Sequence, residues 1–210
     1  RTGCKLAVFD TTGKLLHTQV IYPTPPQKKV KEASDILLLC VKKYNVDTVA
    51  IGNGTASAET RAFVAEAIKT HALDVKVFMV NESGASVYSA SELAAEEFPQ
   101  LDLTQRSAVP IARRLQDPLA EYVKIDPKSI GVGQYQHDMH AGYLSHRLAG
   151  VVESCVNDVG VDLNTASPSL LSYVSGITAS VAKNIVAYRE KYGAFVSRKQ
   201  LTEVARLGPK

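Results

Sequence analysis

One stretch of the sequence recurs in register 30 residues further along the chain. Residues 171–178 (LSYVSGIT) align with residues 201–208 (LTEVARLG), so that a leucine, a valine and a final apolar residue keep the same spacing. In both copies an apolar helix end leads into a tight turn that contains glycine, a residue that lets the backbone turn sharply. The repeat predicts two hairpins of the same design within a helical segment.

The first copy continues with Ala182, Lys183, Ile185 and Val186 at helical spacing, which completes a helix-hairpin-helix pattern. The amide groups at the start of such a helix, together with the helix dipole, form a ready site for a phosphate. We therefore expect contact with nucleic acid around the two hairpins and the basic residues near them. The residues expected to make this contact are Gly176, Ile177, Thr178, Lys183, Arg198, Lys199, Gly208 and Lys210.

Charge along the chain favours the same segment. Residues 171–210 hold seven Lys and Arg against two acids, giving +5, and the other 170 residues hold 17 against 19, giving −2. Phosphate contacts position a protein without reading bases, so we expect little sequence preference and a strong dependence on salt. Each copy has only one of the two usual glycines, since Thr178 and Arg206 occupy the other positions. A plain connection between two helices is the alternative for either copy.

The part of the chain before residue 81 alternates strand and helix patterns. A hairpin of two strands at 6–22 is followed by an amphipathic helix at 28–45, with apolar residues at helical spacing. A strand at 48–51, a helix at about 57–71 and a strand at 75–80 come next. Such alternation predicts a layered α/β domain with some parallel strand pairing. Further helices are expected at 86–97, 107–115 and 117–124.

Residues 125–136 contain Asp126-Pro127 and two glycines, which is typical of a linker. We therefore expect an α/β domain at 1–130 and an all-α domain at 131–210. An apolar stripe opens the second domain and predicts a helix with one face in the core. Its members are Leu148, Val151, Val152, Cys155, Val156 and Val159.

Three strings carry a family resemblance: residues 113–138 (RRLQDPLAEYVKIDPKSIGVGQYQHD), 81–89 (NESGASVYS) and 161–166 (VDLNTA). They resemble the Tex family of transcription accessory proteins. The resemblance implies a ribonuclease-H-like domain of YqgF type followed by a helix-hairpin-helix domain. It also implies binding of RNA and DNA, the transcription machinery as a further partner, and a cytoplasmic location. The family's longer chains carry an OB-type RNA-binding domain and a first sheet strand with an acidic turn, both expected outside these 210 residues.

A ribonuclease-H-like fold raises the alternative of a nuclease or resolvase. Such enzymes hold Mg²⁺ ions with three or four carboxylates, and the candidates here are Glu82, at a strand end, and Asp117, at the head of a helix. Asp117 before Pro118 also fits an ordinary helix N-cap, and Glu82 fits a solvated strand end. We expect that the domain keeps the ribonuclease-H-like fold, lacks nuclease activity and serves as a scaffold. Mg²⁺ is expected as a cofactor only if the nuclease alternative holds. A third alternative is a scaffold for protein partners.

The cysteines, the histidines and the apolar runs of the sequence give no strong indication of a further functional site. The three cysteines are far apart, and Cys40 and Cys155 lie on apolar helix faces, where we expect them in the core. A metal site at His137, His140 and His146 lacks a convincing set of further ligands, so these are interpreted as polar linker residues. No run reaches eighteen apolar residues, which predicts no membrane span.

Overall fold

The computed structural model describes residues 3–131 and 133–208, which divide into two compact units. The α/β unit comprises residues 1–10 and 15–115, and the helical unit comprises residues 11–14 and 116–210. The division therefore lies about fifteen residues before the boundary expected from the linker-like composition near residue 130. Each unit has its own core and is described separately.

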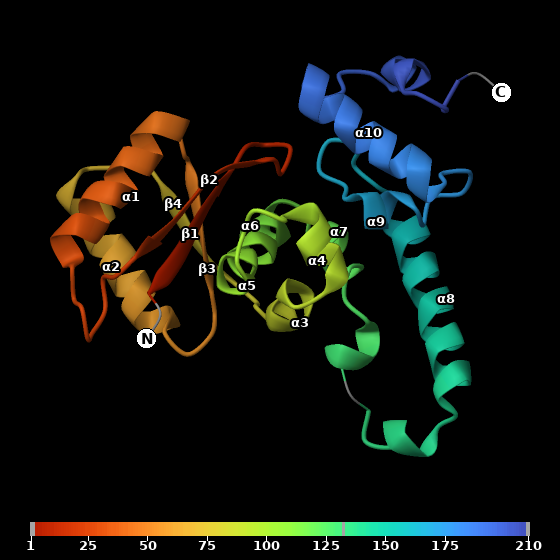
Figure 1. Ribbon diagram of the computed structural model, residues 1–210, viewed down its shortest axis with the longest axis horizontal. Helices are drawn as coiled ribbons and strands as arrows, with labels where there is room; N and C mark the ends of the chain where they lie inside the picture. Colours follow the sequence, from red (N-terminus) through yellow and green to blue (C-terminus); the bar gives the residue numbers. More distant parts are fainter. Residues whose placement is uncertain (1–2, 132, 209–210) are drawn as a thin grey trace. The chain divides into compact units, whose positions relative to one another are not determined.

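The strands of the α/β unit follow the order that the sequence predicts (Figure 1). Strand β1 (Cys4–Phe9) pairs antiparallel with β2 (Leu15–Ile21), and the predicted hairpin is thus confirmed. Strand β3 (Thr48–Gly52) pairs with β4 (Lys76–Val80) in parallel, Thr48 opposite Lys76. Because β3 and β4 run in the same direction, the loops that follow them meet at one edge of the sheet.

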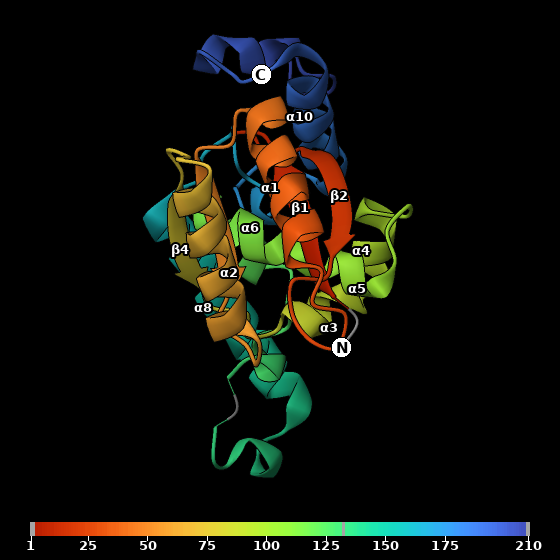
Figure 2. The same cartoon turned by 90° about the vertical axis from the view of Figure 1, so that its left-hand side faces the viewer.

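Helices cover both sides of these strands (Figures 1 and 2). Helices α1 (Val30–Tyr44) and α2 (Ser57–Thr70) lie on one side, and their buried faces meet β3 in a core that includes Leu37, Ile51 and Val64. Four shorter helices lie on the other side. They are α3 (Ala85–Ser89), α4 (Glu92–Glu97), α5 (Leu103–Arg106) and α6 (Ala108–Gln116). The mixed α/β fold expected from the alternating pattern is confirmed.

The helical unit consists of four helices and three short 3₁₀ turns among its described residues. The helices are α7 (Pro118–Tyr122), α8 (Ala141–Val159), α9 (Pro168–Leu171) and α10 (Ala179–Tyr192), and the turns are η1 (Pro127–Ser129), η2 (Gln136–Asp138) and η3 (Arg198–Glu203). Their core gathers Val156, Leu170, Leu171 and Ile185, each at most 1% exposed.

Helix α7 explains why the division lies early. Ala120 is 2% exposed within the core of the helical unit, and the hydroxyl of Ser167 donates to its carbonyl over 2.7 Å. The linker-like signals at Pro127 and Gly131 therefore follow a helix that already packs with the second unit. Proline and glycine mark turns, and a turn need not separate two hydrophobic cores.

The apolar stripe on α8 is used less fully than predicted. Val156 is buried, but Val151 and Val159 are 58% and 75% exposed, and Cys155 is exposed as well. Val152 and Val156 of the stripe contact the core, whereas the other face of the stripe stays exposed. The expectation that Cys155 lies in the core is wrong, whereas the burial of Cys40 is confirmed.

Arg189 is a buried cation of the helical core, although the charge pattern of the sequence places it among the basic residues of the C-terminal segment. It is 4% exposed, and its Nη1 donates to the carbonyls of Leu163 and Ala166 over 2.8 and 2.7 Å. Both carbonyls belong to the loop that leads into α9. The guanidinium therefore fastens α10 to that loop and is not available to contact a ligand directly.

We predict that Arg189→Ala lowers the free energy of unfolding by about 3 kcal/mol, because two buried carbonyl groups lose their donor. Urea denaturation followed by circular dichroism measures the loss. The matched control is Arg198→Ala, which removes an exposed arginine from η3 and should change stability little. Equal effects of the two substitutions would contradict the role given to Arg189.

Candidate nucleic-acid interface

The two predicted hairpins form with the same backbone hydrogen bonds. In the first hairpin (residues 174–178), the N–H of Ile177 donates to the carbonyl of Val174 over 3.0 Å. In the second hairpin (residues 204–208), Leu207 donates to Val204, also over 3.0 Å. The 30-residue repeat is thus a repeat of structure as well as of sequence.

The repeat extends further upstream than the aligned letters suggested. Ser167 is the N-cap of α9 and Ser197 is the N-cap of η3, again 30 residues apart. The hydroxyls of Ser172 and Thr202 each donate to the carbonyl three residues earlier, over 2.7 and 2.8 Å. A serine in register at positions 167 and 197 was the signal that could have revealed these caps.

One backbone position in each hairpin requires a left-handed conformation. Gly176 has φ +83°, and Arg206, at the equivalent position of the second copy, has φ +69°. Glycine adopts this region freely, whereas a residue with a Cβ is strained there. A Cβ placed on Gly176 would meet no atom within 4 Å, so the turn faces open space. The first hairpin therefore offers close access to its backbone, and the second presents a cationic side chain instead.

Thr178 stands where a second glycine is usual because it caps α10. Its Oγ1 accepts the N–H of Val181 over 3.3 Å, and its extended backbone needs no glycine. The N–H groups of Ala179 and Ser180 belong to the same first turn and have no partner inside the helix. They lie at the positive end of the dipole of a 14-residue helix. This arrangement can accept an anion.

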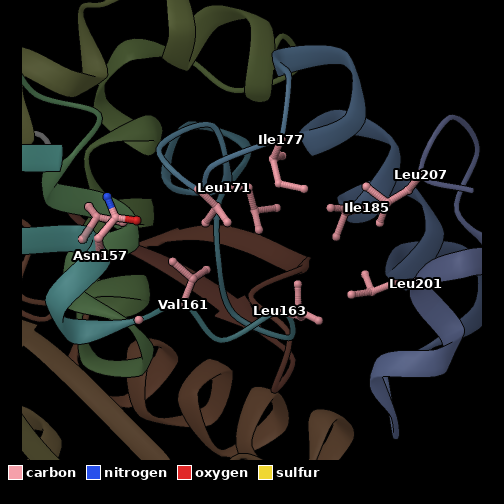
Figure 3. A pocket seen from close by; sticks show the side chains of 11 residues that line it. Asn157, Val161, Leu163, Leu171, Ile177, Ile185, Leu201 and Leu207 are labelled. Atoms are coloured by element: carbon pink, nitrogen blue, oxygen red, sulfur yellow. The ribbon is translucent and has the colours of Figure 1, made fainter. Parts of the chain in front are cut away.

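Ile177 lies differently from the other residues of the predicted contact set. Its side chain packs against the core and lines an apolar pocket of about 250 Å³, so it supports the hairpin from within. Figure 3 shows Ile177, Leu207, Ile185 and Leu201 directed toward the same space between the two hairpins. The pocket is lined by Val156, Asn157, Gly160, Val161, Leu163, Leu171, Val174, Ile177, Ile185, Leu201 and Leu207. Ile177 of the first hairpin and Leu207 of the second both pack against the same helical core, so apolar contact with this core holds the two hairpins together.

The basic residues of the predicted set that the structure describes are on the surface. Lys183 is exposed on α10, within two turns of Thr178, and Arg198 and Lys199 are exposed on η3. Gly208 is exposed at the end of the second hairpin, and Lys210 lies outside the described residues. Exposed cations near the turns are available to phosphate groups.

A side chain that the sequence did not single out links the second hairpin to the first. Asn184 Nδ2 donates to the carbonyl of Ala205 over 2.8 Å, so the second hairpin is held beside α10. The exposed Lys183 directly precedes Asn184 in sequence. A single helix therefore begins at one hairpin and positions the other.

An aromatic cluster lies at the far end of α10. The ring of Tyr188 stacks on Phe195 with centroids 5.1 Å apart and meets Tyr192 at 4.7 Å. The hydroxyl of Tyr188 donates to the carboxylate of Glu203, and this hydrogen bond raises the pKa of Tyr188 above its usual value. Tyr188 thus packs between the repeats, while Tyr192 stays 63% exposed.

Glu82 stands at the end of β4, beside the loop that follows β3. Its N–H donates to Asn53 Oδ1 over 3.1 Å, and a Cβ on Gly54 would lie 1.7 Å from its carboxylate oxygen. A Cβ on Gly52 would lie 2.5 Å from the other oxygen. The two glycines therefore leave the room that the carboxylate occupies at the ends of the parallel strands.

Asp117 is committed to structure in the helical unit. Its Oδ1 accepts the N–H of Ala120 over 3.0 Å, and its Oδ2 accepts the hydroxyl of Thr165 over 2.9 Å. Its interpretation as a helix N-cap is confirmed. Across residues 3–131 and 133–208, no three His, Cys, Asp or Glu side chains gather into a group that could hold a metal ion. His140 also acts as an N-cap, for α8.

In the part of the chain that the structure describes, no helix combines the length and apolar character needed to cross a membrane.

Comparison with protein families decides what the α/β unit is. The family model for the Tex protein YqgF-like domain matches residues 1–116, more than half of the chain. The chain belongs to the Tex family. A second model, for the helix-hairpin-helix motif, matches residues 156–210 and covers both hairpins. The predicted succession of a ribonuclease-H-like YqgF-type domain and a helix-hairpin-helix domain is confirmed.

Relatives in the Tex family are similar along the whole of this chain. Protein YhgF of Escherichia coli is 59% identical over 211 residues, covering 100% of this chain and 27% of its own length. The transcriptional accessory protein Tex of Neisseria gonorrhoeae is 54% identical, with the same coverage. The human S1 RNA-binding domain-containing protein 1 is 51% identical, covering 99% of this chain and 21% of its own length. The chain thus spans about a quarter of the length of these relatives.

The difference between the two hairpins predicts a difference between two alanine substitutions. Gly176→Ala should lower the free energy of unfolding by about 1 kcal/mol, because alanine is strained at positive φ. Arg206→Ala, at the equivalent position, should change it by less than about 0.5 kcal/mol, since a Cβ is already present there. Urea denaturation of both variants measures the contrast. Equal losses would mean that the two turns do not share the geometry described.

Proposed function

We propose that this chain binds RNA or DNA through the phosphate backbone, using the two hairpins, without reading base sequence. The observation that supports this most strongly is the pairing of two hairpins of the same geometry on one helix. The first offers the open turn at Gly176 and the first-turn amides of α10, and the second offers Arg206. Two such sites held at a fixed separation suit a polymer with regularly spaced phosphates.

Electrostatics support the same proposal. Lys183, Arg198 and Lys199 are exposed in the unit that carries the hairpins, and Arg206 is exposed in the second turn itself. Arg189 is buried, so fewer cations are available for direct phosphate contact than the sequence count suggested. The remaining cations still favour binding of a polyanion. Such binding weakens as the salt concentration rises, because the release of counterions from the nucleic acid is then less favourable.

The names of the relatives extend the proposal to the cellular process in which this chain acts. One relative is named a transcriptional accessory protein and another an S1 RNA-binding domain-containing protein. We therefore place this chain in transcription, as the nucleic-acid-binding portion of a cytoplasmic accessory protein with further domains. The transcription machinery is the proposed protein partner.

The α/β unit then serves as a scaffold. Glu82 stands at a strand end where a nuclease would keep an acid, but Asp117 is occupied by Ala120 and Thr165. Two-metal hydrolysis needs several carboxylates in one place. Glu82 without such a group around it in the described residues supports a role in organising the loops at the ends of β3 and β4.

Charge reversal at the first hairpin tests the proposed interface. Lys183→Glu should weaken binding of a fluorescein-labelled duplex and lower the slope of log affinity against log salt by about 1. Fluorescence anisotropy across a range of salt concentrations measures both. Lys31→Glu, an exposed lysine on α1 of the α/β unit, makes the same change of charge and should leave the slope unaltered. If neither variant differs from the unsubstituted chain, the interface lies elsewhere and the protein-scaffold alternative gains.

Incubation with Mg²⁺ tests the scaffold assignment. We predict no release of label from single-stranded or duplex oligonucleotides, because among the described residues no three His, Cys, Asp or Glu side chains gather into a group that could hold a metal ion. Electrophoresis of the products after extended incubation measures release. Metal-dependent cleavage that Glu82→Gln abolishes would establish the nuclease instead.

A further inference from the structure

Tyr192 is a large aromatic residue left on the surface at the C-terminal end of α10. It is 63% exposed, and Val196, in the segment that follows the helix, is 87% exposed. Exposure of this kind in a single residue is common. Here, however, the exposed ring belongs to an ordered cluster with charged neighbours, which gives it a defined orientation.

Packed and hydrogen-bonded neighbours hold the ring of Tyr192 in place. Tyr188 meets its ring at 4.7 Å, and Phe195 stacks on Tyr188 in turn. Asn164 accepts the N–H of Phe195 over 2.7 Å and donates to its carbonyl over 3.0 Å. Tyr188 is also fixed through Glu203. The ring of Tyr192 is therefore held by packed neighbours while much of its surface stays open, so a ligand that stacks on it pays little ordering entropy.

Cations accompany the ring. Lys191 Nζ lies 4.8 Å from the centroid of Tyr192, and Arg198 and Lys199 are exposed on the neighbouring turn η3. A lysine above an aromatic ring is a flexible partner that a planar ligand can displace. An exposed aromatic ring with a lysine beside it and further exposed cations on the turn that follows in sequence complements a base and its flanking phosphates.

The location of Tyr192 relates it to the first hairpin. Helix α10 begins at Ala179, directly after the first hairpin, and ends at Tyr192, which at 1.5 Å per residue places the two ends about 20 Å apart. The exposed Lys183 lies between them. Lys183 and Tyr192 are nine positions apart, which at about 3.6 residues per turn puts the two side chains on opposite sides of α10. A strand that runs from the first hairpin to Tyr192 therefore meets Lys191 as the cation beside the ring.

We infer that Tyr192 stacks on a base of single-stranded nucleic acid whose backbone is held at the first hairpin, with Lys191 and Arg198 facing the flanking phosphates. The inference rests on the proposed nucleic-acid binding and adds a strand preference to it. In a duplex, each base is covered by its stacked neighbours and paired to its partner, so it cannot settle on the ring. The Tyr192 surface therefore selects unpaired strands, without regard to sequence.

The test compares single-stranded and duplex binding by the 210-residue chain, using fluorescence anisotropy with a short labelled oligothymidylate and a duplex of the same length. Tyr192→Ala should weaken single-strand binding by about fivefold to a hundredfold, the range of one lost base–aromatic stack, and leave duplex binding unchanged. Tyr192→Phe should retain single-strand affinity. The matched control is Tyr143→Ala, which removes a tyrosine on α8 that is 58% exposed and should have no effect.

A 2-aminopurine base in the single strand reports stacking directly. Its fluorescence should be quenched on binding to the unsubstituted chain and remain unquenched with Tyr192→Ala. If Tyr192→Ala matches Tyr143→Ala, or weakens duplex and single-strand binding equally, the stacking role is wrong, and Lys183→Glu tests the hairpins separately. If the unsubstituted chain binds neither nucleic acid at low salt, the proposed function and this inference both fail.

Discussion

The buried guanidinium of Arg189 joins α10 to the loop before α9 by two short hydrogen bonds, to the carbonyls of Leu163 and Ala166. The first hairpin lies between α9 and α10, so these two hydrogen bonds join the segment before the hairpin to the helix that follows it. Asn184, on the same helix, bonds the second hairpin. A buried cation that donates to two buried carbonyl groups is costly to remove, because the carbonyl groups it leaves behind cannot reach water. The relative placement of the two turns thus depends on one helix and its polar side chains.

The two turns share a backbone geometry but differ in what they present. Gly176 provides positive φ at no steric cost, whereas Arg206 adopts the same region with strain. Strain of this kind persists where the surroundings impose it, and here the hydrogen bond from Leu207 to Val204 and the packing of Leu207 against the core do so. The arginine places a charge where the glycine leaves space. A phosphate would therefore meet backbone amides at the first turn and a side-chain cation at the second.

Local patterns predicted much of the structure. The strand and helix order up to β4, the hairpin repeat and the cap at Asp117 all follow from periodicity and turn chemistry, which act over a few residues. Burial depends on partners distant in sequence, so the exposure of Cys155, the burial of Arg189 and the packing of α7 with the second unit did not follow. Ile177 shows the same limit within the candidate site: its place in the motif was evident, but its inward direction depends on Leu201 and Leu207.

The central claim is that phosphates contact the chain at the hairpins. Amide chemical shifts of the nitrogen-15-labelled chain, followed during titration with a short duplex, test it most directly, because each N–H reports separately. The account predicts the largest changes at Gly176, Ala179 and Ser180 and around Arg206, diminishing as salt is added. Changes confined to the α/β unit, with the amides of both hairpins unmoved, would contradict it.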